Sequence, residues 1–258
     1  MRFIFLMTSL FMLYSCAAKK LAVQHADTFI THSVEKKIPL NNQQEKELAK
    51  DVDQFLMKKK IAAQEILPLI DKMDPSEPTL FDEIYASLLK SYRGIAEDFS
   101  TILAKYIVDL NNRQQKIFFE RLKEDLETKK KKNSEERLSD IKRKVERLIG
   151  SLSDSQEKML RSHSNYFQKK GNLYLDLKEK LHTRLESILT QDSAPKTKRE
   201  LVVEAFMNYQ DESILSSKEN VALVKEFSPT LTLKQKEYFR GKVKELKEII
   251  GYYLDTQY

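Results

Sequence analysis

The chain has 258 residues, of which 41% are hydrophobic and 33% charged, and its formal net charge is +6 at pH 7. Glycine and proline are scarce, tryptophan is absent, and Lys, Glu and Leu are abundant, which is typical of long solvated helices and argues against a protein built from sheets. A single cysteine excludes an internal disulfide. The basic excess suits an acidic partner, although the 45 basic and 39 acidic residues are interspersed as on ordinary helix surfaces.

The first sixteen residues have the pattern of an export signal. Arg2 precedes an apolar run over residues 3–14, and Ser15 and Cys16 follow it. A secretory signal has a positive start, an apolar core of about 7–15 residues and a small residue near the cleavage site. The run is shorter than the roughly 20 apolar residues that span a membrane. We therefore predict a signal peptide at residues 1–15 and an exported body at residues 16–258.

The end of this signal resembles the lipobox of bacterial lipoproteins. Leu13, Ser15 and Cys16 occupy the Leu, small-residue and cysteine positions, with Tyr14 between them. In that family the cysteine thiol receives a diacylglyceryl group, the signal is cleaved before it, and the new amino terminus is acylated, typically with palmitate. The resemblance implies lipidation of Cys16 and stable attachment, because two or more acyl chains hold a protein durably to a membrane. An ordinary secretory signal that happens to contain a cysteine is the alternative.

The residue after the cysteine bears on localisation. In Gram-negative lipoproteins an aspartate at this position favours retention in the inner membrane, and this chain has Ala17 there. The resemblance therefore implies a lipid-anchored protein of the bacterial cell envelope that faces the periplasm, with the outer membrane slightly favoured over the inner.

Apolar residues recur at helical spacing along most of the body, and no segment alternates as a strand does. Thr79 and Ser134 are the expected caps of two helices, and Gly171 an expected break in another. We predict an all-α protein, an elongated multi-helix bundle with long amphipathic helices and candidate hinges near residues 129–134 and 192–198. The expected helices cover approximately residues 19–36, 42–71, 80–106, 112–126, 135–149, 154–189, 201–209, 214–227 and 233–250.

Four helix starts share one pattern, here called the glutamine motif: Leu, then Asn, Ser or Thr, two variable residues, then Gln. This spacing predicts a capping box, in which the cap side chain accepts from the third helical amide and the Gln side chain accepts from the cap amide. The copies are unequally spaced, which argues against a solenoid. The repeated pattern has two alternative explanations: four helix starts that arose independently, or a trait of the protein's family. The motifs lie at residues 40–44, 110–114, 152–156 and 231–235.

The order of motifs resembles a group of proteobacterial helical lipoproteins without an established function. The shared features are the lipobox, a membrane-proximal helix, the first three glutamine motifs and the sequence Glu-Ile-Leu-Pro at residues 65–68. The similarity covers most of residues 16–189. It departs from the family at residues 61–63, Ile-Ala-Ala, where members carry Trp-His-Arg. The last two motifs are also similar to the repeated motif of Spy-like periplasmic chaperones, which are small, cradle-shaped helical proteins.

Residue patterns for catalysis are missing from the sequence. Glu179 and His182 have the i, i+3 spacing of carboxylate-bridged metal bundles, but such a site needs a second pair, and no other histidine has Glu three residues before it. There is no Gly-rich phosphate loop and no Gly-x-Ser-x-Gly elbow. We therefore expect no catalytic residues, no cofactor, no metal and no enzymatic activity.

These patterns together predict a membrane-anchored envelope lipoprotein. Its partners are expected to be the membrane, through acyl chains on Cys16, and other envelope proteins, which the body binds as a non-catalytic scaffold or chaperone-like module. Export argues against nucleic acid. A cell-wall-active enzyme and a lipid-handling protein are the alternatives. The basic residues within 129–147 are either a solvated surface or a contact for anionic lipid or an acidic wall polymer.

Overall fold

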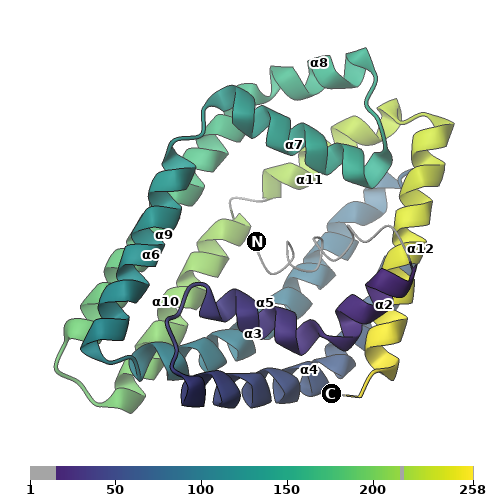
Figure 1. The fold of residues 1–258 in the computed structure, drawn as a ribbon. Helices are drawn as coiled ribbons and strands as arrows, with labels where there is room; N and C mark the ends of the chain where they lie inside the picture. The colour runs from purple at the N-terminus through teal and green to yellow at the C-terminus, as the bar shows by residue number, and fades with distance from the viewer. Residues whose placement is uncertain (1–15, 216–217, 258) are drawn as a thin grey trace.

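The computed structural model describes residues 16–215 and 218–257, and every regular element in them is a helix (Figure 1). The all-α prediction is confirmed. No helix of this part is both long and apolar enough to cross a membrane. Residues 13–15 of the predicted lipobox lie outside the described residues. The helices are α2 (Cys16–Gln24), α3 (Ala26–Glu35), α4 (Asn42–Asp71), α5 (Phe81–Val108), α6 (Asn112–Lys130), α7 (Ser134–Ile149), α8 (Asp154–Ser162), α9 (Ser164–Thr190), α10 (Pro195–Leu215), α11 (Lys218–Phe227) and α12 (Leu233–Asp255), with 3₁₀ turns η1 (Pro78–Leu80) and η2 (Ser228–Thr230).

All four glutamine motifs form the predicted capping boxes. At the start of α4, the Asn41 side chain accepts from the Gln44 amide at 3.0 Å, and the Gln44 side chain accepts from the Asn41 amide at 3.0 Å. The same reciprocal pair opens α6, α8 and α12. Two of the orphan amides at each helix start are thereby satisfied.

A fifth capping box opens α7, and it corrects the predicted cap. Asn133, rather than Ser134, accepts from the amide of Glu136 at 2.9 Å, and the Glu136 carboxylate accepts from the Asn133 amide. A cap at Ser134 would place Arg137 third in the helix, and a guanidinium cannot accept a hydrogen bond.

Two other expected boundaries are wrong. Thr79 does not cap α5, because Pro78 begins a 3₁₀ turn that carries Thr79 into the helix, whereas a cap needs an extended backbone. Gly171 does not interrupt α9; the break lies at His163, between α8 and α9. The Arg137 guanidinium of α7 occupies the space that a Cβ of residue 171 would take, so this glycine permits a close approach of two helices.

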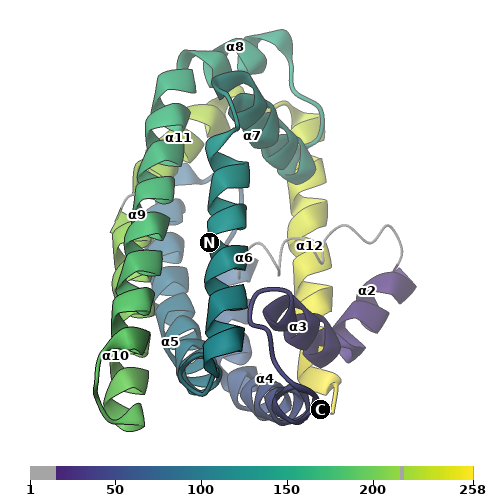
Figure 2. The ribbon, with the colours of Figure 1, turned by 60° about the vertical axis from the view of Figure 1, so that its left-hand side comes forward.

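The helices enclose a frame, which Figure 1 shows with α4 below, α12 at the right, α7 and α8 above and α6 with α9 at the left. α5 packs along α10 behind the frame, and α2 and α3 lie on the opposite side (Figure 2). A hydrophobic core cluster joins α2, α3, α4, α5, α6, α9, α10 and α12. Its most deeply buried members are Leu48, Val52, Ala104, Ile107, Leu185, Ile188 and Val202.

Candidate functional site

The glutamines of the capping boxes are joined in two pairs. The Gln114 side chain donates to the Gln44 side-chain oxygen at 2.8 Å, which joins the starts of α4 and α6. Gln156 and Gln235 donate to each other at 3.0 and 2.9 Å, which joins the starts of α8 and α12. Both members of the second pair are buried. Each motif therefore caps its own helix and also binds a second helix start.

A further set of hydrogen bonds repeats at both pairs. Each glutamine donates its side-chain amide to a backbone carbonyl two residues before the cap of its partner helix. A buried amide that is satisfied in this way avoids the cost of an unpaired donor. The four bonds run from Gln44 to Asp109 at 3.5 Å, Gln114 to Pro39 at 2.7 Å, Gln156 to Thr230 at 3.0 Å and Gln235 to Ser151 at 2.8 Å.

The two glutamine pairs mark two similar halves of the body. The paired glutamines are 70 residues apart in one half and 79 in the other. Between them lie α4 and α5 in the first half, and α8 to α11 in the second. The packing between the halves is reciprocal: α5 lies on α10, α6 of the first half packs on α9, and α12 of the second half packs on α4.

Sequence analysis found the motifs but not their pairing. The signal was present in the two similar separations, 70 and 79 residues. A second sign that the four helix starts are alike is an apolar residue seven positions after each cap. These residues are Leu48, Phe118, Leu160 and Phe239.

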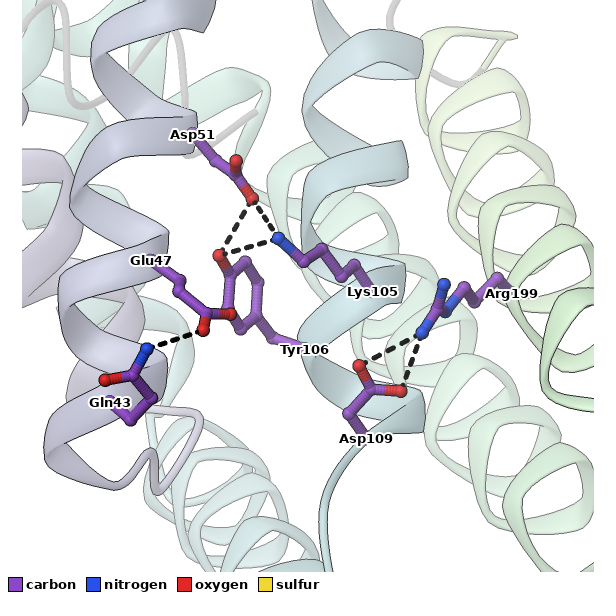
Figure 3. A network of polar contacts seen from close by, with 7 residues as sticks. All are labelled: Gln43, Glu47, Asp51, Lys105, Tyr106, Asp109 and Arg199. Carbon is purple, nitrogen blue, oxygen red and sulfur yellow. Dashed lines mark hydrogen bonds and ion pairs between the residues drawn. The ribbon is translucent and has the colours of Figure 1, made fainter.

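Polar contacts tie α4 to α5, and the C-terminal end of α5 to α10 (Figure 3). The hydroxyl of buried Tyr106 and the ammonium of Lys105 both donate to one oxygen of Asp51, each at 2.8 Å. Burial, followed by the hydrogen bond to Asp51, raises the pKa of Tyr106 well above its usual value, so the hydroxyl remains a donor. The other contacts in this view are Gln43 with Glu47 at 2.8 Å and Arg199 with both oxygens of Asp109 at 2.8 and 3.0 Å.

The predicted lipidation residue, Cys16, is the first residue of α2. α2 packs on α12, and the Lys20 ammonium lies 5.7 Å from the centre of the Tyr252 ring. The segment that would carry the acyl chains therefore joins the folded body without an intervening linker.

Glu179 and His182 do not form a pair. Glu179 lies 3.1 Å from the Lys130 ammonium, while half-buried His182 faces α6 near Asp125. Burial, followed by the Lys178 ammonium, lowers the pKa of His182 to about 4. Asp125 itself contacts Lys178, Lys37 at 3.3 Å and Lys129 at 2.6 Å. Among the described residues, no three His, Cys, Asp or Glu side chains are grouped as a metal site requires.

The basic residues within 129–147 lie among carboxylates from four helices. Five of the nine basic side chains in this segment form ion pairs with these carboxylates. The ion pairs are Lys129 with Asp125, Lys130 with Glu179, Lys132 and Arg143 with Asp140, and Lys142 with Glu157.

One corner of the frame exposes large apolar side chains. Gly150 ends α7 with φ of 82°, and the Tyr238 ring lies 3.7 Å from the position a Cβ of residue 150 would take. Tyr238 is 43% exposed, while Leu148 in the last turn of α7 is 51% exposed and Leu233 at the start of α12 is 79% exposed. We call Leu148, Leu233 and Tyr238 the α7–α12 corner. Exposed apolar side chains at a helix junction are candidates for contact with another protein.

Other surface features are shallow. Two hollows are each lined by one helix, one by residues of α9 that include Glu179 and Arg184, and the other by Asp140, Arg143, Lys144 and Arg147 of α7. Both are open depressions with charged walls. No hydrophobic or aromatic residue lines either hollow, whereas such residues predominate in the lining of a small-molecule site.

Comparison with protein-family models, with curated proteins and with solved structures finds no match to this chain. A function is therefore inferred from its own residues. The features that carry such an inference are the position of Cys16 and the exposed α7–α12 corner.

Proposed function

We propose that this protein is a lipid-anchored lipoprotein of the bacterial cell envelope, and that its helical body binds other envelope proteins as a scaffold or chaperone-like module. The anchoring is supported by the signal-like residues 1–15 and by the lipobox that ends at Cys16. Acyl chains on Cys16 would hold the body beside the membrane, on its periplasmic side. Ala17 slightly favours the outer membrane over the inner.

The observation that carries the binding role is the α7–α12 corner. Its three exposed side chains lie around a helix junction that the buried pair Gln156 and Gln235 holds in place. A preorganised apolar surface binds with a smaller entropic cost than one that must first become ordered. The similarity of the last two glutamine motifs to Spy-like chaperones agrees with this role.

Binding is tested with the full lipidated chain and an unfolded envelope polypeptide whose aggregation is followed by light scattering. We expect the wild type to delay aggregation, and Leu148→Ser with Tyr238→Ser to weaken this effect severalfold. Leu173→Ser, on α9 and 42% exposed, is the matched control and should behave as wild type. Equal protection by all three chains, or protection by none, would remove support for the corner.

Anchoring is tested separately by mass spectrometry of the mature amino-terminal peptide. A diacylglyceryl group on Cys16 and an acylated amine are expected. A mature chain that begins elsewhere, or a Cys16 thiol without lipid, would contradict the proposal.

A further inference from the structure

We propose that the outward face of α2 and α3 lies in the interface of the bilayer that holds the anchor, and so sets the orientation of the whole frame. This inference rests on the proposed function, because it takes Cys16 as the point of lipid attachment. The face would form a second, non-covalent contact with the membrane.

The two helices have one buried and one exposed face. The buried face packs on α4 and α12 through Ala22, Val23, Ile30, Thr31 and Val34. On the opposite face Leu21 is 55% exposed and Phe29 is 49% exposed, which leaves two large apolar side chains in contact with solvent. The other exposed residues of this face are Lys20, Gln24, His25, Thr28, His32 and Lys36.

The charge of this face suits an anionic lipid surface. None of its exposed residues is a carboxylate, although acidic residues are frequent elsewhere in the chain. The two carboxylates of the segment are only partly exposed: Asp27 accepts from the Thr28 hydroxyl at 3.2 Å, and Glu35 lies 3.6 Å from His32. Lysines beside anionic headgroups and apolar side chains below them are the pattern of interfacial helices.

The position of the anchor places this face at the membrane. Cys16 begins α2, so Leu21 is about 8 Å and Phe29 about 20 Å from it along the helices, at 1.5 Å per residue. A segment that starts at the lipid and lies along the bilayer brings both side chains to the interface. No other described apolar face begins at the attachment point.

This orientation leaves the α7–α12 corner accessible. Lys20 contacts Tyr252 near the end of α12, whereas Tyr238 lies near its start. Tyr252 lies fourteen positions after Tyr238 in this helix, which is about 21 Å. The corner would therefore stand away from the membrane-contacting face, where a partner can reach it.

An introduced cysteine can be labelled selectively, because Cys16 is the only cysteine of the chain and acylation removes its thiol. Leu21→Cys and Phe29→Cys each introduce one free thiol for an environment-sensitive fluorophore, and Leu173→Cys on α9 is the control. The full lipidated variants are placed in phosphatidylethanolamine–phosphatidylglycerol vesicles that carry quencher-bearing lipids. Flotation on a density gradient reports the anchor.

We expect all three variants to float, with the probes at residues 21 and 29 blue-shifted and quenched severalfold more than the probe at residue 173. Replacing phosphatidylglycerol by phosphatidylcholine should reduce this quenching. Floating chains with equally unquenched probes would overturn this inference and leave the anchor intact. Chains that do not float would overturn the anchor and with it the contact.

Discussion

The side chains of Gln156 and Gln235 donate to each other's carbonyl oxygens across the junction of α8 and α12, and both residues are buried. Each also accepts from the amide of its own helix cap and donates to a backbone carbonyl of the other helix start. One pair of glutamines thus satisfies several groups that would otherwise be buried without partners. The hydrogen bonding of this buried junction therefore depends on both glutamines.

Removing one member of this pair should be costly. Gln156→Ala leaves the Gln235 amide and the Thr230 carbonyl short of partners, and we expect a loss of about 2–3 kcal/mol in the free energy of unfolding. Gln43→Ala is the control, since Gln43 is exposed and its side chain binds only Glu47; its expected cost is below about 0.5 kcal/mol. Urea denaturation measures both. Similar losses for the two variants would show that pairing contributes little.

The contributions of Gln44 and Gln114 to the free energy of unfolding should be coupled. Gln44→Ala and Gln114→Ala remove the two sides of a 2.8 Å hydrogen bond, so the double variant should be less destabilised than the sum of the single variants by about 1 kcal/mol. Gln44 and Gln235 belong to different pairs, and their substitutions should be additive. A double-mutant cycle with urea as denaturant gives both quantities. Additivity within the 44–114 pair would contradict direct coupling.

Gly150 is required by its backbone conformation. With φ of 82° and ψ of −167°, this residue lies in a region that side chains rarely adopt, and Gly150→Ala should cost about 1–3 kcal/mol. Gly94→Ala is the matched control, because Gly94 lies inside α5 with open space around it and alanine favours helix by about 1 kcal/mol. The two substitutions should therefore shift the thermal midpoint in opposite directions. A stabilising Gly150→Ala would refute the assignment.

The protein should lose stability as pH falls from 7 to 5. The folded pKa of His182 is about 4, below the roughly 6.5 of an unfolded histidine, so the unfolded chain takes up this proton first. The stability is complete above pH 6.5 and is lost as pH falls toward 4. For a half-buried group we expect on the order of 1 kcal/mol. His182→Gln should remove this part of the pH dependence in urea titrations, and an unchanged slope would contradict it.

The sequence predicted the parts of the fold that depend on neighbouring residues. Capping boxes are such a case, because cap and glutamine lie three residues apart, and all four motifs begin helices as expected. The predicted cap at Ser134 was wrong by one residue. Asn133 can also accept from a helix amide, and it places Glu136, which can accept from the cap amide, third in the helix. The predicted helix over residues 19–36 is likewise present but broken at His25.

Features that depend on distant residues were not predictable from one sequence. Gly171 was interpreted as a break, yet its reason is Arg137, which approaches from another helix. The glutamine pairs join residues 70 and 79 positions apart. These similar separations are visible in the sequence, but they do not show that the glutamines of a pair touch each other. The α7–α12 corner was missed for the same reason, because Tyr238 reaches Gly150 at the end of α7 only when α7 packs on α12.

The exchange of helices between the halves has a consequence for biogenesis. α12, which ends at Asp255, packs on both α4 and α2, near the other end of the described chain. A chain is made amino end first, so the surface of α2 and α4 that α12 covers stays exposed until the last helix is made. If the chain is exported and anchored as proposed, this surface is the one beside the lipid, and a holdase that binds it during translocation should increase the yield of folded protein.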